Sequence, residues 1–139
     1  MRLSLLDRSR TRSGRPESEG LTGSVDRAVE AERLGYDRFW VAEHHAVPGI
    51  ASGSPPVLLA AIGARTDRIR LGSGGVMLPN HQPLVVAEQF LMLEALHPGR
   101  WIWASVARSA SPRPFARRCA TISTPPTRSR TIWSSCATS

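Results

Sequence analysis

A carboxylate and two imidazoles stand side by side at Glu43, His44 and His45. An imidazole exchanges a proton near neutral pH, and a neighbouring carboxylate can orient it or raise its basicity. The cluster therefore predicts a proton-transfer site in which His44 moves the proton and Glu43 supports it. The alternative, for His45 in particular, is a polar loop residue that only satisfies hydrogen bonds.

A metal site is not predicted. Three ligands in a Glu-His-His run do not share one face, and His81 and His97 have no partner at metal-ligand spacing. Cys119 and Cys136 also lack the spacing of a zinc site or of a disulfide framework. We therefore expect no bound metal.

The histidine cluster follows a predicted strand. Residues 38–42 form an aromatic and β-branched run of strand length, and Glu43 comes directly after it. In α/β proteins the loops that follow the carboxyl ends of parallel strands frame the ligand crevice. The position of the cluster therefore agrees with its chemistry.

Helices alternate with strands along residues 1–100. Strands are expected at 3–6, 38–42 and 69–73, and helices at 21–34, 54–66 and 83–96. Strands that recur roughly every thirty residues fit right-handed parallel crossovers. Two α/β fold classes use this order, a doubly wound sheet and a (β/α)8 TIM barrel. The residues expected to face the core are Val57, Leu58, Ala61 and Ile62 on the second helix, and Val86, Phe90, Leu93 and Leu96 on the third.

Adjacent glycines, Gly74 and Gly75, follow the third predicted strand. Glycine has no Cβ, so the backbone can approach a ligand closely there. The alternative is an ordinary loop between strand and helix. The spacing of a dinucleotide-binding glycine motif is absent.

Positive charge is concentrated at the end of the chain. The formal net charge is +7, yet residues 1–100 carry 12 Arg against 11 Asp and Glu, while residues 101–139 carry 6 Arg and no acid. All of the basic residues are Arg, which indicates a GC-rich gene rather than a selected basic surface. We expect no nucleic-acid partner, although a basic nucleic-acid-binding module is the alternative from another class of function.

No segment resembles a signal peptide or a membrane span. Asp7 interrupts the first apolar run, and no stretch approaches the ~20 apolar residues that a span requires. The expected location is the cytoplasm, without a membrane partner.

Residues 1–100 resemble the bacterial luciferase-like flavin monooxygenase family. The resemblance is carried in order by three segments, which are 38–45 (RFWVAEHH), 68–79 (RIRLGSGGVMLP) and 86–100 (VAEQF through LEALHPGR). It implies a (β/α)8 barrel, of which this chain would hold the first three βα units. It also implies a homodimer of the intact protein as one possible assembly, packed through early helices.

The same resemblance implies a chemistry and a set of site residues. The activity would be oxygenation of an aldehyde-like or small organic substrate by reduced FMN and O2, and the same-fold alternative is an oxidoreductase that uses the deazaflavin F420. His44 would be the catalytic histidine with Glu43 beside it. Gly74, Gly75, Val76 and Met77 would bind the flavin, with a non-proline cis peptide at the glycines, and His45 and Leu78 would bind substrate.

The resemblance ends at Arg100. Family members continue with a strand of the type Val-Asp-Leu-Gly-Leu-Gly-Arg-Ala, where this chain has Trp-Ile-Trp-Ala-Ser-Val-Ala-Arg. With GC-rich codons, restoring one base after Arg100 yields the family text. We therefore interpret 101–139 as an out-of-frame, disordered basic tail, and expect an inactive truncated fragment with low solubility.

Overall fold

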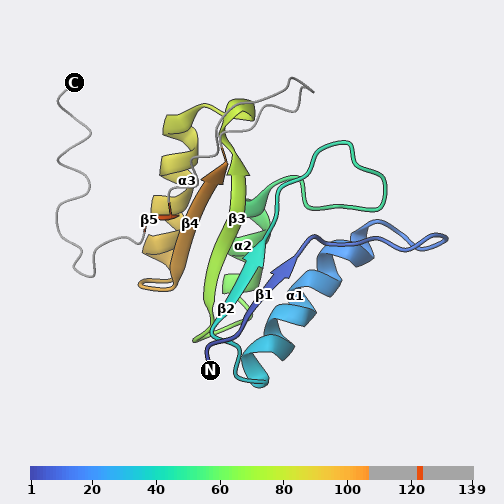
Figure 1. Ribbon diagram of the computed structural model, residues 1–139, viewed down its shortest axis with the longest axis horizontal. Helices are drawn as coiled ribbons and strands as arrows, with labels where there is room; N and C mark the ends of the chain where they lie inside the picture. The colour runs from blue at the N-terminus through green and yellow to red at the C-terminus, as the bar shows by residue number, and fades with distance from the viewer. Residues whose placement is uncertain (107–121, 124–139) are drawn as a thin grey trace.

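The computed structural model describes residues 1–106 and 122–123. Four parallel strands lie side by side in chain order, and three helices cover one face of the sheet (Figure 1). The strands are β1 (Ser4–Asp7), β2 (Arg38–Val41), β3 (Arg70–Met77) and β4 (Trp101–Val106), and a short β5 (Ile122–Ser123) pairs antiparallel with β4. The helices are α1 (Ser18–Arg33), α2 (Pro55–Gly63) and α3 (Pro83–Leu96), and a 3-10 turn, η1 (Leu78–Asn80), precedes α3.

The order of the strands distinguishes the two predicted fold classes. In a doubly wound sheet the chain reverses direction across the sheet, which places β1 in the interior. Here the order is β1-β2-β3-β4, with β1 at an edge. Successive crossovers in one direction are the arrangement of a (β/α)8 barrel, and the described part corresponds to its first four strands.

The third strand is longer than the sequence predicts. β3 continues through Met77, so Gly74 and Gly75 lie inside the strand and not in the loop after it. The pairing of β3 with β4 shifts register between Gly74 and Val76. Adjacent glycines have a low propensity for β-strands, which is why the sequence predicts a loop here. The pairing with β4 holds this segment in the strand conformation.

The parallel sheet also extends past Arg100. Trp101–Val106, expected to begin a disordered tail, instead form β4 in register with β3, so that Leu71 pairs with Trp101. The three predicted βα units are all present, and β4 is a fourth strand that the prediction of disorder from residue 101 missed. The expected disorder of residues 107–121 and 124–139 lies outside the described residues.

The hydrophobic core lies between the sheet and its helices. Phe39, Val41 and Leu71 point from the sheet toward Leu59 and Ile62 of α2, and all five side chains are fully buried. On the opposite face of the sheet, which would point into a closed barrel, Leu6 remains 58% exposed. The described strands therefore bury one face of the sheet and leave the other partly open.

Two polar networks fix the ends of the strands. At the carboxyl end of β1, the buried Asp7 accepts hydrogen bonds from Ser24 and from Arg27, whose Nε lies 3.1 Å from Oδ1. At the amino end of β3, the Glu32 carboxylate accepts the backbone N–H groups of residues 67–69. Arg100 donates there to Thr66 O at 2.5 Å and to Thr66 Oγ1 at 2.6 Å.

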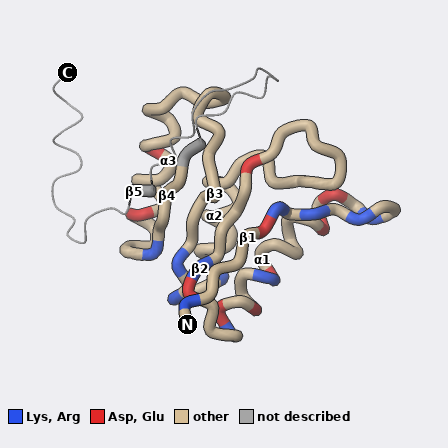
Figure 2. Tube along the Cα trace, in the orientation of Figure 1, with Lys and Arg blue, Asp and Glu red and all other residues tan. Residues whose placement is uncertain are grey.

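The described residues carry mixed charges and contain no helix long and apolar enough to cross a membrane. Figure 2 shows mainly basic positions along the loop before α1 and positions of both signs along α1 itself.

Candidate functional site

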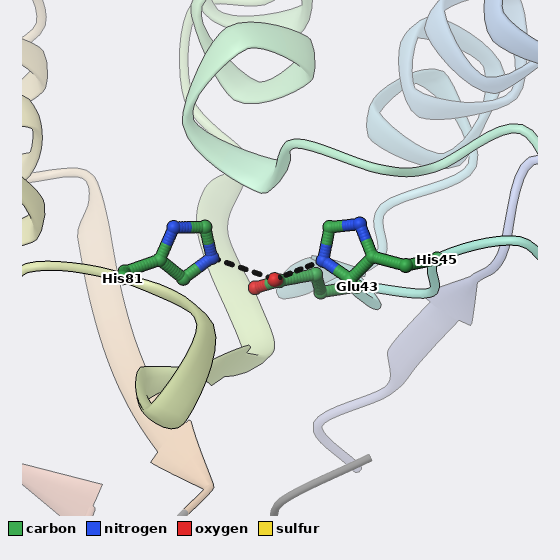
Figure 3. A group of neighbouring side chains, drawn as sticks. All are labelled: Glu43, His45 and His81. Atoms are coloured by element: carbon green, nitrogen blue, oxygen red, sulfur yellow. Dashed lines mark hydrogen bonds and ion pairs between the residues drawn. The ribbon is translucent and has the colours of Figure 1, made fainter.

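Glu43 lies at the centre of a cluster at the carboxyl ends of β2 and β3. Its side chain is fully buried, and the imidazoles of His45 and His81 approach it from opposite sides (Figure 3). His45 comes from the loop after β2, and His81 follows η1 in the connection from β3 to α3. The fold therefore brings residues from two loops to a single carboxylate.

Each oxygen of Glu43 has a defined partner. Oε1 lies 2.6 Å from Nε2 of His45 and 2.6 Å from Nε2 of His81, and Oε2 accepts the backbone N–H of Met77 at 2.9 Å. The His45 side chain is 41% exposed and that of His81 is 31% exposed. The cluster thus has a buried anchor and two histidines that solvent can reach.

The pKa of Glu43 reflects opposing effects. Burial alone would raise it. The hydrogen bonds from His45, from the N–H of Met77 and from His81, together with the charge that His81 carries when protonated, outweigh burial. The pKa of this carboxyl therefore lies below its ordinary value, and Glu43 is an anion at neutral pH.

His44 lies outside the cluster that its neighbours form. Its backbone N–H donates to Ser52 O at 2.9 Å, and its ring Nδ1 is buried without a hydrogen-bond partner among the described residues. The oxygens of Glu43 bond to His45, His81 and Met77, so the structure does not show the expected support of His44 by Glu43. The catalytic role of His44 stays a prediction.

His81 is the site residue that the sequence analysis missed. Metal-ligand spacing motifs join residues that are close in sequence, but Glu43 and His81 are 38 positions apart. The available signal was topological. His81 follows a strand that is parallel to the one before Glu43, so both belong to the same edge of the sheet.

Gly74, in β3, exposes its backbone at the end of the sheet where Glu43 lies. The Gly74–Gly75 peptide is cis, as the resemblance implied, and Gly74 is exposed. A Cβ on Gly74 would lie 3.3 Å from Leu6 Cδ1 and 3.5 Å from Trp40 Cε3. Bare backbone flanked by two apolar side chains fits a flat aromatic ring such as that of a flavin.

The residues after the glycines differ in their accessibility. Val76 is 1% exposed and belongs to the core between sheet and helices. Met77 and Leu78 are partly buried, and Leu78 packs against that core. Of the predicted contacts with flavin and substrate in this segment, Gly74 is therefore the most accessible, and the roles of the others stay predictions.

The loops after β1 and β2 are joined by hydrogen bonds. Ala51 N donates to Ser9 O at 3.0 Å, Thr11 N donates to Gly49 O at 3.0 Å, and Ser52 Oγ donates to Arg8 O at 3.2 Å. Ser52 also accepts the N–H of His44. The backbone that carries the histidines is therefore anchored to the neighbouring loop.

Comparisons with known proteins agree with this geometry. A sequence model of the family described as luciferase-like monooxygenase matches residues 1–130. A luciferase-like monooxygenase of Escherichia coli is 52% identical over 97 residues, which are 70% of this chain and 29% of that protein. The N-acetyl-S-alkylcysteine monooxygenase of Bacillus subtilis is 50% identical over 100 residues, 72% of this chain and 30% of that protein.

Solved structures share the fold. The crystal structure of apo-MsnO8 matches with a TM-score of 0.73 at 44% identity, over 75% of this chain and 32% of that one. The oxygenating constituent of 3,6-diketocamphane monooxygenase from Pseudomonas putida, in complex with FMN, matches with a TM-score of 0.73 at 24% identity, over 78% of this chain and 30% of that one. This chain thus spans about three tenths of the proteins that it matches.

Proposed function

This chain belongs to the luciferase-like monooxygenase family, and on that premise we propose that the full-length protein oxygenates an aldehyde-like or small organic substrate with reduced flavin and O2. One observation carries the proposal. The hydrogen bond from Met77 N to Glu43 Oε2 connects the histidine loop to the strand that contains Gly74. The loop that carries His44, which we propose as the proton-transfer group, therefore starts at the end of the sheet where the Gly74 backbone is exposed.

Each predicted residue has a distinct task in this proposal. A bound reduced flavin would supply the electrons that activate O2. Gly74 and Gly75 would hold the ring, while Leu6 and Trp40 would exclude water beside it. His44 would hold or transfer a proton at Nδ1, which has no hydrogen-bond partner among the described residues.

The flavin we propose is reduced FMN. A protein of the same fold, the 3,6-diketocamphane monooxygenase constituent, is known in complex with FMN. The alternative within the family is F420-dependent hydride transfer. Turnover of reduced FMN with O2, compared with reduction of F420 by the same intact protein, separates the two activities.

We further propose that the reading frame changes after Arg100. The indole Nε1 atoms of Trp101 and Trp103 are both buried without a hydrogen-bond partner among the described residues. An unpaired buried donor costs about 1–3 kcal/mol, so each of these two indoles is a cost that the proposed out-of-frame segment would impose on the fold. Both residues lie just past Arg100, where the resemblance ends.

The 139-residue chain should accordingly bind flavin weakly or not at all. The described residues form four parallel strands, half the number that closes a (β/α)8 barrel, so a flavin would meet an unclosed sheet. The partly exposed inner face, including Leu6, should also lower solubility. A purified 139-residue chain that binds FMN stoichiometrically would contradict this proposal.

Sequencing the gene on both sides of codon 100 tests the change of frame. We expect the adjacent frame to encode a strand of the family type directly after Arg100. An unambiguous read with no family text in that frame would overturn the proposal.

A further inference from the structure

We propose that Glu43, His45 and His81 form a binding site for one divalent transition-metal ion, with Zn²⁺ as the representative ion. One ligand atom from each residue, a carboxylate oxygen and two imidazole nitrogens, lies within 4.8 Å of the others. Nothing in flavin-dependent oxygenation requires such a site. The inference therefore goes beyond the proposed function.

The geometry requires only a small adjustment to admit an ion. Both Nε2 atoms now lie 2.6 Å from Oε1 of Glu43. Around a tetrahedral Zn²⁺ with bonds of about 2.0–2.1 Å, neighbouring ligand atoms are about 3.3 Å apart. Each imidazole nitrogen must therefore move away from Oε1 by less than about 1 Å, and the two nitrogens, now within 4.8 Å of each other, must also come to about 3.3 Å apart. Because His45 and His81 are 41% and 31% exposed, their side chains have room to do so.

The carboxylate is already fixed for coordination through one oxygen. Oε2 of Glu43 is occupied by the N–H of Met77, while Oε1 faces the two histidines (Figure 3). Hydrogen bonds from outside the ligand set orient ligands and are a regular part of metal sites. The buried Glu43 would thus be the rigid ligand, and the imidazoles the adaptable ones.

The chemistry of the donor set selects the kind of ion. Two imidazoles and one carboxylate suit ions such as Zn²⁺, Co²⁺ and Fe²⁺, whereas Ca²⁺ and Mg²⁺ prefer oxygen ligands. A single carboxylate charge offsets part of the charge of the ion. Since both histidines reach solvent, a fourth position would remain open to water or to a small anionic ligand.

A metal ion would compete with the two hydrogen bonds that the histidines make to Glu43. In the structure each Nε2 is within hydrogen-bond distance of Oε1, an arrangement in which each Nε2–H donates a hydrogen bond to the carboxylate. Coordination through Nε2 needs neutral imidazoles that carry their proton on Nδ1, so the ion must displace both hydrogen bonds to Glu43. A hydrogen-bonded cluster without metal affinity is the opposing interpretation, and the experiment below distinguishes the two.

The test is a Co²⁺ and Zn²⁺ titration of the complete 139-residue chain. Cys119→Ser and Cys136→Ser serve as the background, because thiolates would otherwise compete for the metal. We expect visible Co²⁺ bands that saturate at one ion per chain and that Zn²⁺ abolishes. Changing a residue that merely orients a ligand costs 10–100-fold in affinity, so Glu43→Gln, His45→Ala and His81→Ala should each cost at least about 100-fold. His97→Ala is the matched control, because His97 lies against Gly63, away from the cluster, and it should leave the affinity unchanged.

A second measurement needs no variant. Zn²⁺ should protect His45 and His81 from acylation by diethyl pyrocarbonate, as read by peptide mass spectrometry, while His97 keeps its reactivity. Far-UV circular dichroism identifies any variant that fails to fold, and the protection result then decides. The proposal is overturned if Co²⁺ gives no saturable bands, if the three cluster variants bind as the control does, or if His45 and His81 are not protected.

Discussion

Nε2 of His81 lies 2.6 Å from Oε1 of Glu43, although the two residues are 38 positions apart. Together with the bond from Met77 N to Oε2, this contact ties the loop after β2 to the end of β3 and to the turn that follows it. Glu43 is therefore the residue on which the arrangement of this end of the sheet depends.

Removing the Glu43 carboxylate should destabilise the fold. Glu43→Ala leaves the N–H of Met77 and two imidazoles without their acceptor. We expect a loss of about 2 kcal/mol in the free energy of unfolding, because the orphaned N–H of Met77 costs about 1–3 kcal/mol, whereas the two partly exposed imidazoles can bond to water. Urea unfolding followed by circular dichroism measures this loss. The matched control is Glu88→Ala on the exposed side of α3, which should change stability by less than about 0.5 kcal/mol. Equal effects of the two substitutions would contradict the role given to Glu43.

Two glycine-to-alanine substitutions should have opposite effects. A Cβ on Gly72 would lie 2.6 Å from the Trp40 ring and 2.8 Å from Ile102 O, whereas one on Gly23 would meet only the flexible end of Arg27, at 3.2 Å. Gly72→Ala should destabilise the protein by about 1–3 kcal/mol through overpacking. Gly23→Ala should stabilise α1 by up to about 1 kcal/mol, since Ala is the better helix former. Thermal melts of both variants measure the two effects, and a tolerated Gly72→Ala would show that Trp40 does not lie over this backbone.

Stability should fall in acid through Glu32. Partial burial raises the pKa of this carboxyl, but the backbone N–H groups of Ile69, Arg68 and Asp67, together with the charge of Arg100, lower it more. The folded-state pKa is therefore below the unfolded value, near 4.5. The stabilisation is complete above the unfolded pKa and is lost as pH falls through the folded one. Glu32→Gln should lower stability at neutral pH and reduce its dependence on pH below about pH 5. An unchanged slope of unfolding free energy against pH in that variant would rule out Glu32 as the source.

Much of the fold follows from sequence periodicity. α3 occupies the predicted residues 83–96, and the parallel order of the first three strands is confirmed. The buried faces were harder to predict. Leu58 and Ile62 are buried as expected, but Val57 is 69% exposed and Leu59 is fully buried. α2 is apolar on nearly every side, so helical spacing alone does not select its inward face.

Leu96 and β4 are two further places where prediction from the sequence failed. Leu96 fits the apolar period of α3 but is 64% exposed, because it is the last residue of the helix. Nothing in the sequence of Trp101–Val106 continues the alternation of strands and helices seen in residues 1–100. The segment nevertheless pairs with β3 through backbone hydrogen bonds. A free strand edge accepts a neighbour largely independently of its side chains.

The sequence predicts where the candidate site lies, but it does not predict which of its residues bond to one another. Glu43 and the Gly74–Gly75 pair were identified because strand ends and adjacent glycines are local signals. The bond between Glu43 and His81 depends on which strands are neighbours, and no local pattern encodes that. Residues that follow adjacent parallel strands are therefore the ones to compare when such a site is sought.

The most direct test is a titration of reduced FMN, under anaerobic conditions, into the product of the gene with one base restored after codon 100, followed by mixing with O2 and an aliphatic aldehyde. We predict that the restored product binds one FMN per chain and transfers an oxygen atom to the aldehyde, and that the 139-residue chain does neither under the same conditions. Failure of a folded, restored product to bind FMN, or stoichiometric binding by the 139-residue chain, would contradict the proposed function.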